Sequence, residues 1–166
     1  MKAVILAAGK GKRLHSEETK LPKCMVRANG RPLLDYVLDY TSFIPREDKI
    51  IVVGFYKEVI EAHLPGYSFA FQREQKGTGD AVMAAYDLLA DYGGDVLVIN
   101  GDMPLIRESS LRALLELHRR EANDCTVLTY YESGELPPFG RVLRGADGRV
   151  CDIREYKDAN ESERAV

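Results

Sequence analysis

Short apolar runs alternate with amphipathic stretches along most of this chain. The apolar runs are rich in β-branched and aromatic residues and predict strands at residues 2–7, 49–54, 67–72, 95–100 and 125–131. Because these runs are nearly continuously apolar, they are typical of central strands buried on both faces. Helical periodicity lies between them, at residues 32–40, 57–64, 79–90 and 109–121. This alternation predicts an α/β fold, a mostly parallel sheet with helices on both faces.

The pattern changes after residue 131. Residues 141–156 predict a β-hairpin that turns at Asp147-Gly148. The last ten residues are polar, so we expect a frayed end there. Because there is no internal repeat and no linker-like stretch, we expect one domain over residues 1–166, with the hairpin as a subregion at about 139–157.

Composition narrows the classes of protein to consider. An apolar fraction of 45% is enough for a buried core, and the formal net charge is −3. A chain with no surplus of cations is a poor general binder of nucleic acid, so we expect none. The longest apolar runs are too short for a membrane span or a signal peptide. Three cysteines without CxxC spacing argue against a disulfide scaffold and a zinc site, and we expect a cytoplasmic protein.

The first predicted strand runs into a loop of glycines and cations. Ligands of open α/β sheets bind at the carboxyl ends of strands, so this loop lies where a substrate should bind. Backbone amides of the small residues can cradle an anion, and five cations fall within fourteen positions: Lys10, Lys12, Arg13, Lys20 and Lys23. The spacing matches neither GxGxxG nor a P-loop. A solvated basic turn is the alternative, but the coincidence of glycines, cations and strand end favours a phosphate site.

Three more segments carry candidate chemistry. Gln72 and Gln75 can read a base edge, and the following Gly-Thr-Gly opens a helix; a glycine-rich turn with an N-cap is an equal alternative. Asp102 follows the most apolar strand and is suited to Mg²⁺, against the common alternative of an N-cap or turn aspartate. Gly140 permits close approach to a ligand and Glu155 could accept hydrogen bonds from sugar hydroxyls, although by themselves they indicate an ordinary hairpin.

Together and in this order, the four segments resemble those of the bacterial N-acetylglucosamine-1-phosphate uridylyltransferases (UDP-N-acetylglucosamine pyrophosphorylases). This is a branch of the sugar-phosphate nucleotidyltransferase family. Its motifs LAAGxGTR with PK, QxxQxGTG, GDxPL and YGR…ExKDA are matched by Leu6, Ala7, Ala8, Gly9, Gly11, Arg13, Pro22, Lys23, Gln72, Gln75, Gly77, Thr78, Gly79, Gly101, Asp102, Pro104, Leu105, Gly140, Arg141, Glu155, Lys157 and Asp158. Lys12 and Asp80 depart from the pattern, where Thr and His are usual.

The resemblance implies a Rossmann-like fold of the nucleotide-diphospho-sugar transferase type, here truncated at its C-terminal end. It implies that UTP and N-acetylglucosamine-1-phosphate react with the help of Mg²⁺ to give UDP-N-acetylglucosamine and pyrophosphate. By resemblance, the catalytic residues are Arg13 and Lys23. The nucleotide-binding residues are Leu6, Ala7, Ala8, Gly9, Gly11, Gln72, Gly77 and Thr78. The sugar-binding residues are Asn100, Gly101, Asp102, Gly140 and Glu155, and Asp102 also binds the metal.

Two alternatives stay open on the sequence. The first is a nucleotidyltransferase for another base or sugar phosphate. The second is a non-catalytic nucleotide-binding module, because the family's domain continues beyond residue 166 with an Asn that contacts the sugar and a second Mg²⁺ ligand.

Overall fold

The computed structural model describes residues 1–9, 11, 21–130 and 137–166. They form two compact units, Met1–Ala113 and Leu114–Val166. Within these residues, no helix is long and apolar enough to cross a membrane. The single domain over residues 1–166 stays a prediction.

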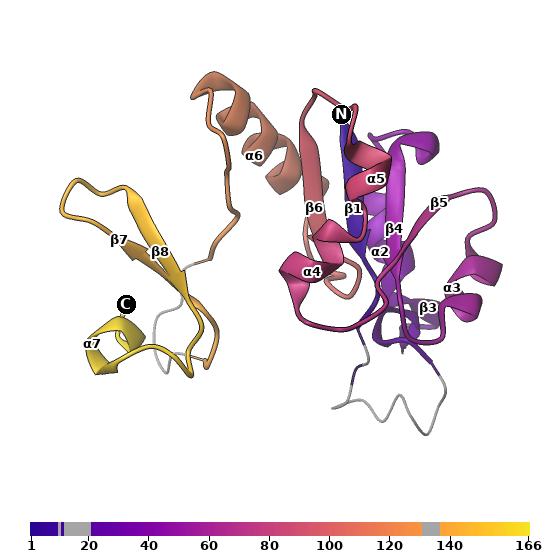
Figure 1. The fold of residues 1–166 in the computed structure, drawn as a ribbon, viewed down its shortest axis with the longest axis horizontal. Coiled ribbons are helices and arrows are strands. Elements are labelled where there is room, and N and C mark those ends of the chain that lie inside the picture. Colours follow the sequence, from indigo (N-terminus) through magenta and orange to yellow (C-terminus); the bar gives the residue numbers. More distant parts are fainter. Residues whose placement is uncertain (10, 12–20, 131–136) are drawn as a thin grey trace. The chain divides into compact units, whose positions relative to one another are not determined.

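The first unit is built on a four-stranded parallel sheet with the strand order β5-β4-β1-β6 (Figure 1). Its strands are β1 (Lys2–Leu6), β4 (Lys49–Val53), β5 (Ser68–Phe71) and β6 (Val96–Asn100). Every residue of β4 is buried, as expected for a strand with a neighbour on each side. The parallel α/β sheet is confirmed, with strand ends within a residue or so of those predicted.

Helices cover both faces of this sheet, as predicted. On one face, Ala81 and Ala85 pack against Val4, Ile50 and neighbouring apolar residues of the sheet. The opposite face carries α2 and α3, with Lys57 of α3 lying over the ring of Phe71. The helices of this unit are α2 (Leu33–Tyr40), α3 (Lys57–His63), α4 (Thr78–Met83) and α5 (Tyr86–Leu89). Helix α6 (Glu108–Arg120) begins in this unit, and its residues from Leu114 on belong to the second. Two 3₁₀ turns, η2 (Lys23–Met25) and η3 (Arg46–Asp48), and two short strands, β2 (Arg27–Ala28) and β3 (Arg31–Pro32), complete it.

The predicted helix at residues 79–90 is divided into α4 and α5. Between them the amide of Ala85 bonds the carbonyl of Val82, a 3₁₀-type contact, and Ala85 is completely buried against the sheet. Small side chains let the backbone come close to the strands at this point. Helical periodicity alone gave no sign of the break.

Burial of β6 on both faces was predicted and is wrong. Leu97 and Ile99 are buried, but Val96 and Val98 are 38% and 43% exposed. β6 is an edge strand, and among the described residues the cluster beneath α4 and α5 draws on β1, β4 and β5 only. β5, at the other edge, is likewise only partly buried. An apolar run shows that a strand is hydrophobic, not which of its faces is covered.

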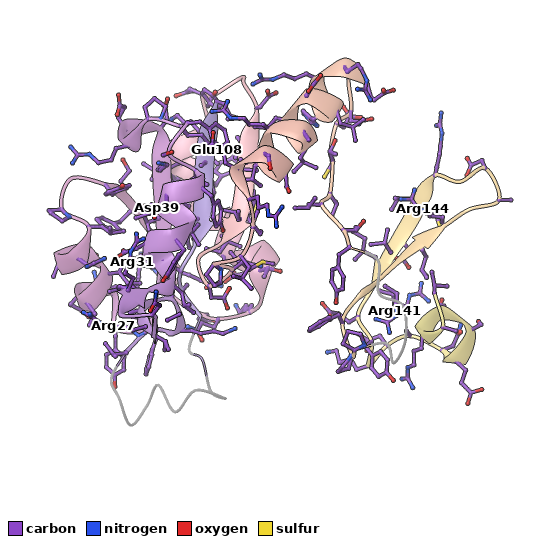
Figure 2. All side chains as sticks on the ribbon, turned by 180° about the vertical axis from the view of Figure 1, so that it is seen from behind. Arg27, Arg31, Asp39, Glu108, Arg141 and Arg144 are labelled. Atoms are coloured by element: carbon purple, nitrogen blue, oxygen red, sulfur yellow. The ribbon has the colours of Figure 1, made fainter. Side chains whose placement is uncertain are left out.

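The second unit contains the predicted hairpin, with β7 (Arg141–Arg144) antiparallel to β8 (Val150–Arg154). Gly148 has a φ of +77° and donates its amide to the carbonyl of Gly145, as a tight turn requires. The buried Arg141 donates to the carbonyls of Pro137, Phe139 and Arg164 at 2.8–3.1 Å. Figure 2 shows it on the hairpin near α7.

Two predictions for this unit are wrong. Residues 125–130 form no strand, and residue 131 lies outside the described residues. A strand forms only against a partner, which an apolar run cannot supply. The end of the chain is not simply frayed, because α7 (Glu161–Arg164) has a capping box between Asn160 and Glu163. The N-x-x-E spacing was the signal for it.

Candidate functional site

A pocket of about 250 Å³ opens at the carboxyl ends of β1, β5 and β6. This is the edge of a parallel sheet at which ligands of α/β folds bind. Its lining comes from the segments that follow those strands, together with η2 and α4: Leu6, Ala7, Ala8, Gly9, Lys23, Cys24, Gln72, Gln75, Gly77, Thr78, Ala81, Asn100 and Asp102. Segments up to about a hundred residues apart in the sequence therefore meet around one cavity.

Backbone contacts hold the segment after β1 against its neighbours. Ala7 donates its amide to the carbonyl of Val52 at 2.8 Å, and Gln75 Nε2 donates to the carbonyl of Ala8. Gly54 allows this close approach, because a Cβ there would lie 3.1 Å from the Ala8 Cβ. Gly54 was not among the predicted residues, although a glycine directly after a buried strand is a signal for such an approach.

The turn after β5 is organised around Gln72. Its backbone amide bonds the carbonyl of Val53 at 2.8 Å, and the residue is only 6% exposed. Its side-chain Nε2 donates to the carbonyl of Gly77 at 3.2 Å and to Oδ2 of Asp80 at 2.7 Å. Gly77 has a φ of +128°, in the region that favours glycine. The turn thus carries a buried, fully oriented amide at the pocket wall.

The charged end of the pocket is an ion pair between Lys23 and Asp102. The two side chains are 45% and 24% exposed, so both can be reached by a ligand. Burial, and secondarily the charge of Asp102, raises the pKa of the Cys24 thiol to about 12. The same two causes raise the pKa of Tyr40, whose hydroxyl donates to the carbonyl of Met103. Cys24 is therefore a neutral thiol at neutral pH, which argues against a nucleophilic role.

Among the described residues that line the pocket, the one carboxylate, Asp102, suits a metal bound together with phosphates. Among the described residues, no group of three His, Cys, Asp or Glu side chains is placed to hold a metal ion. Mg²⁺ does not need such a cage, because it commonly takes one or two carboxylates and completes its shell with water and substrate phosphates. Asp102, which lines the pocket together with Asn100, fits that kind of site.

Most of the predicted site residues meet in this pocket. Those that line it are Leu6, Ala7, Ala8, Gly9, Lys23, Gln72, Gly77, Thr78, Asn100 and Asp102. Gly101 does not line it but packs beneath it, since its amide bonds the carbonyl of Leu6 at 2.9 Å and a Cβ would lie 3.1 Å from that oxygen. Gly11 is described but does not line it either.

Three other predicted site residues are not described as part of this pocket. Arg13 lies outside the described residues. Gly140 and Glu155 lie in the second unit, so their part in the site stays a prediction. The structure also places in the pocket wall two residues that the sequence did not predict there, Cys24 and Ala81. Both are small apolar residues with no motif of their own, and only their burial beside the cavity reveals them.

The model of the MobA-like NTP transferase domain matches residues 3–161. This chain belongs to the MobA-like NTP transferase domain family. Among its curated relatives are proteins named bifunctional protein GlmU from Streptococcus equi subsp. zooepidemicus, 44% identical over 99% of this chain, and from Bacillus cereus, 42% identical over 99%. The resemblance drawn from the four motifs is confirmed. In both cases the match spans 35% of the relative, so this MobA-like chain covers about a third of the length of those proteins.

Solved structures agree on the fold. UDP-glucose pyrophosphorylase complexed with UDP-glucose superposes with a TM-score of 0.73 at 21% identity, over 98% of this chain and 70% of that one. A structure of apo UDP-glucose pyrophosphorylase gives a TM-score of 0.73 at 20% identity, over 98% of this chain and 71% of that one. At this level of identity the likeness establishes the Rossmann-like nucleotide-diphospho-sugar transferase fold of the MobA-like chain.

Proposed function

We propose that this chain is a sugar-1-phosphate nucleotidyltransferase domain that uses UTP and N-acetylglucosamine-1-phosphate to form UDP-N-acetylglucosamine and pyrophosphate. The observation that carries the proposal is the single pocket that joins the small-residue segment after β1, the Gln72 turn and the Lys23–Asp102 pair. Membership of an NTP transferase family and the identity with proteins named GlmU support it.

The chemistry suits the groups present. An oxygen of the sugar phosphate attacks the α-phosphorus of UTP in line, the bond from the α-phosphorus to the bridging oxygen breaks, and pyrophosphate leaves. Such a reaction depends on positioning and on neutralising charge more than on acid–base groups. Among the described residues the pocket contains no histidine, and the high pKa of Cys24 keeps its thiol neutral. Lys23 is the cation placed to neutralise phosphate, with Arg13 proposed as its companion.

The remaining roles are proposed from the family resemblance, and the pocket lining supports those of the residues that it contains. The backbone of residues 6–9 with Gln72, Gly77 and Thr78 would hold uridine. Asn100 and Asp102 would face the sugar phosphate, with Gly140 and Glu155 proposed for the sugar ring. Asp102 would hold Mg²⁺, which when bound supplies positive charge to the phosphates. In the free chain Lys23 neutralises Asp102, and a polyphosphate would compete for that lysine.

Pyrophosphate release across the four NTPs and several sugar-1-phosphates tests the proposal. We expect turnover with UTP and N-acetylglucosamine-1-phosphate, and a loss of about two orders of magnitude or more in Asp102→Asn. The matched control is Asp91→Asn, an exposed carboxylate away from the pocket, which should retain full turnover. Unchanged turnover and Mg²⁺ dependence in Asp102→Asn would contradict the role of Asp102.

The same assay separates the alternatives. Comparable turnover with another base or sugar phosphate would favour a different nucleotidyltransferase. Binding of UTP in calorimetry without pyrophosphate release from any pair would favour a nucleotide-binding unit that is not catalytic by itself. Absence of both binding and turnover in a folded chain would overturn the assignment of the pocket.

A further inference from the structure

The side-chain amide of Gln72 is held by two oxygen atoms. Its Nε2 carries two hydrogens, and these go to the carbonyl of Gly77 at 3.2 Å and to Oδ2 of Asp80 at 2.7 Å. Gln72 is 6% exposed and Asp80 is partly buried, so water competes weakly for these bonds. Both donor positions of the amide are therefore occupied before any ligand arrives.

The chemistry of these partners decides which way the amide faces. A glutamine can present either its oxygen or its nitrogen, and the two atoms look alike in most structures. Here a backbone carbonyl and a carboxylate are both acceptors that cannot donate. Turning the amide over would place Oε1 of Gln72 against two oxygens. The hydrogen bond to the charged carboxylate of Asp80 is the stronger of the two constraints.

The atom left for a ligand is therefore Oε1, an acceptor. Among the described residues no donor contacts it. Gln72 also lines the pocket. The Gln72 side chain therefore offers the pocket a hydrogen-bond acceptor and no free donor.

We propose that Asp80 is a positioning residue that sets the base preference of this pocket. By holding Nε2 of Gln72, it presents Oε1 to a pyrimidine whose ring nitrogen carries a hydrogen. Uracil has N3–H at that place, whereas N3 of cytosine is an acceptor and would face Oε1 with no hydrogen between them. This inference rests on the proposed function, because it assumes that the base of a nucleotide binds beside Gln72. Asp80 itself touches Gln72, not the base.

Calorimetry of the 166-residue chain with UTP and with CTP, each with Mg²⁺, provides the test. The informative quantity is the ratio of the two affinities, because removing the charge of Asp80 changes the attraction for both triphosphates alike. We expect Asp80→Leu to lower the UTP-to-CTP ratio by about tenfold, since one of two bonds that orient the amide is lost. Asp80→Asn should retain much of the ratio, because its side-chain oxygen can still accept from Nε2. Asp87→Leu, an exposed position on α5, is the matched control and should not change the ratio.

A second measurement reports on the amide directly. The side-chain NH₂ protons of Gln72, assigned by their disappearance in Gln72→Ala, should exchange slowly in the native chain and in Asp80→Asn and rapidly in Asp80→Leu. If circular dichroism shows that Asp80→Leu does not fold, Asp80→Ser, whose side chain is too short to reach Nε2, takes its place.

The outcomes separate the two proposals. A native chain that prefers UTP, with the same ratio in Asp80→Leu, overturns the role of Asp80 and leaves the proposed function intact. Equal affinities for UTP and CTP in the native chain overturn the inference and the uracil preference, but not nucleotide binding. A folded chain that binds neither triphosphate overturns the proposed function and the inference with it.

Discussion

The two compact units are stabilised by different kinds of contact. Of the buried apolar residues that the structure describes, all except Ala159 belong to Met1–Ala113. In Leu114–Val166 the buried centre is the guanidinium of Arg141, which donates to three backbone carbonyls and lies over the ring of Tyr156. Hydrophobic burial is non-directional and scales with area, whereas hydrogen bonds depend on particular donors. The sheet unit should therefore be sensitive to lost volume, and the hairpin unit to lost polar partners.

The largest effect is expected where volume is removed from the sheet. Ile51 is completely buried in β4, and Ile51→Ala should lower the free energy of unfolding by about 2–5 kcal/mol, because it removes apolar contacts and leaves a cavity. Urea unfolding measures this. The control is Ile153→Ala in β8, whose side chain is 55% exposed and whose loss should change stability by less than about 0.5 kcal/mol. Similar losses at the two positions would contradict the contrast between the units.

A middle-sized effect is expected at Arg141. Arg141→Met keeps much of the side-chain volume but leaves three carbonyls without their donor, which should destabilise the hairpin unit by about 1–3 kcal/mol. Amide hydrogen exchange should speed up in β7 and β8 and stay unchanged in β1 and β4. Arg144→Met is the matched control, because Arg144 (Figure 2) is exposed and, among the described residues, its hydrogen bond is to the nearby carbonyl of Gly148. Equal protection in both variants would show that Arg141 does not hold this unit together.

The smallest effect is a dependence on acid in the hairpin unit. A hydrogen bond and ion pair with Arg154 lower the pKa of Asp152 from its ordinary value of 3.8. Because the folded state binds this proton more weakly than the unfolded state, the stabilisation is present above that value. It is lost as the pH falls from 3.8 through the lowered pKa. Exchange of the β8 amides should therefore rise in this range before that of β4 does.

The control for this effect is Asp152→Asn, which removes the titrating group. In that variant the difference between β8 and β4 should no longer change with pH over this range. A pH dependence that persists in Asp152→Asn would assign the effect to another group. A response of β4 that precedes that of β8 would reverse the contrast between the units.

The candidate site was predicted from the sequence to a large extent, because its residues follow the apolar runs directly. The backbone of residues 6–9 and Asp102 could be placed at strand ends, and Lys23 in the basic loop after the first strand. Parallel strands bring their carboxyl ends to one edge of the sheet. Gly54 and Cys24 were not found. Gly54 matters because Ala8 comes close to it, and the pKa of Cys24 is raised in part by the charge of Asp102. Ala8 and Asp102 belong to other segments of the chain. Gly101 was assigned to sugar binding because of its motif, although it packs on Leu6.

The sequence by itself determined the features that depend on nearby residues. The periodicity of β1, β4, α2 and α3 and the turn at Asp147-Gly148 arise from interactions over a few positions, so a linear pattern contains them. Only the tertiary structure decided that Val96 and Val98 of β6 are exposed, that residues 125–130 form no strand, and that Nε2 of Gln72 donates to Asp80. Each of these depends on whether a partner is present. The burial of a face, the pairing of a strand and the orientation of an amide are set by what lies opposite in space.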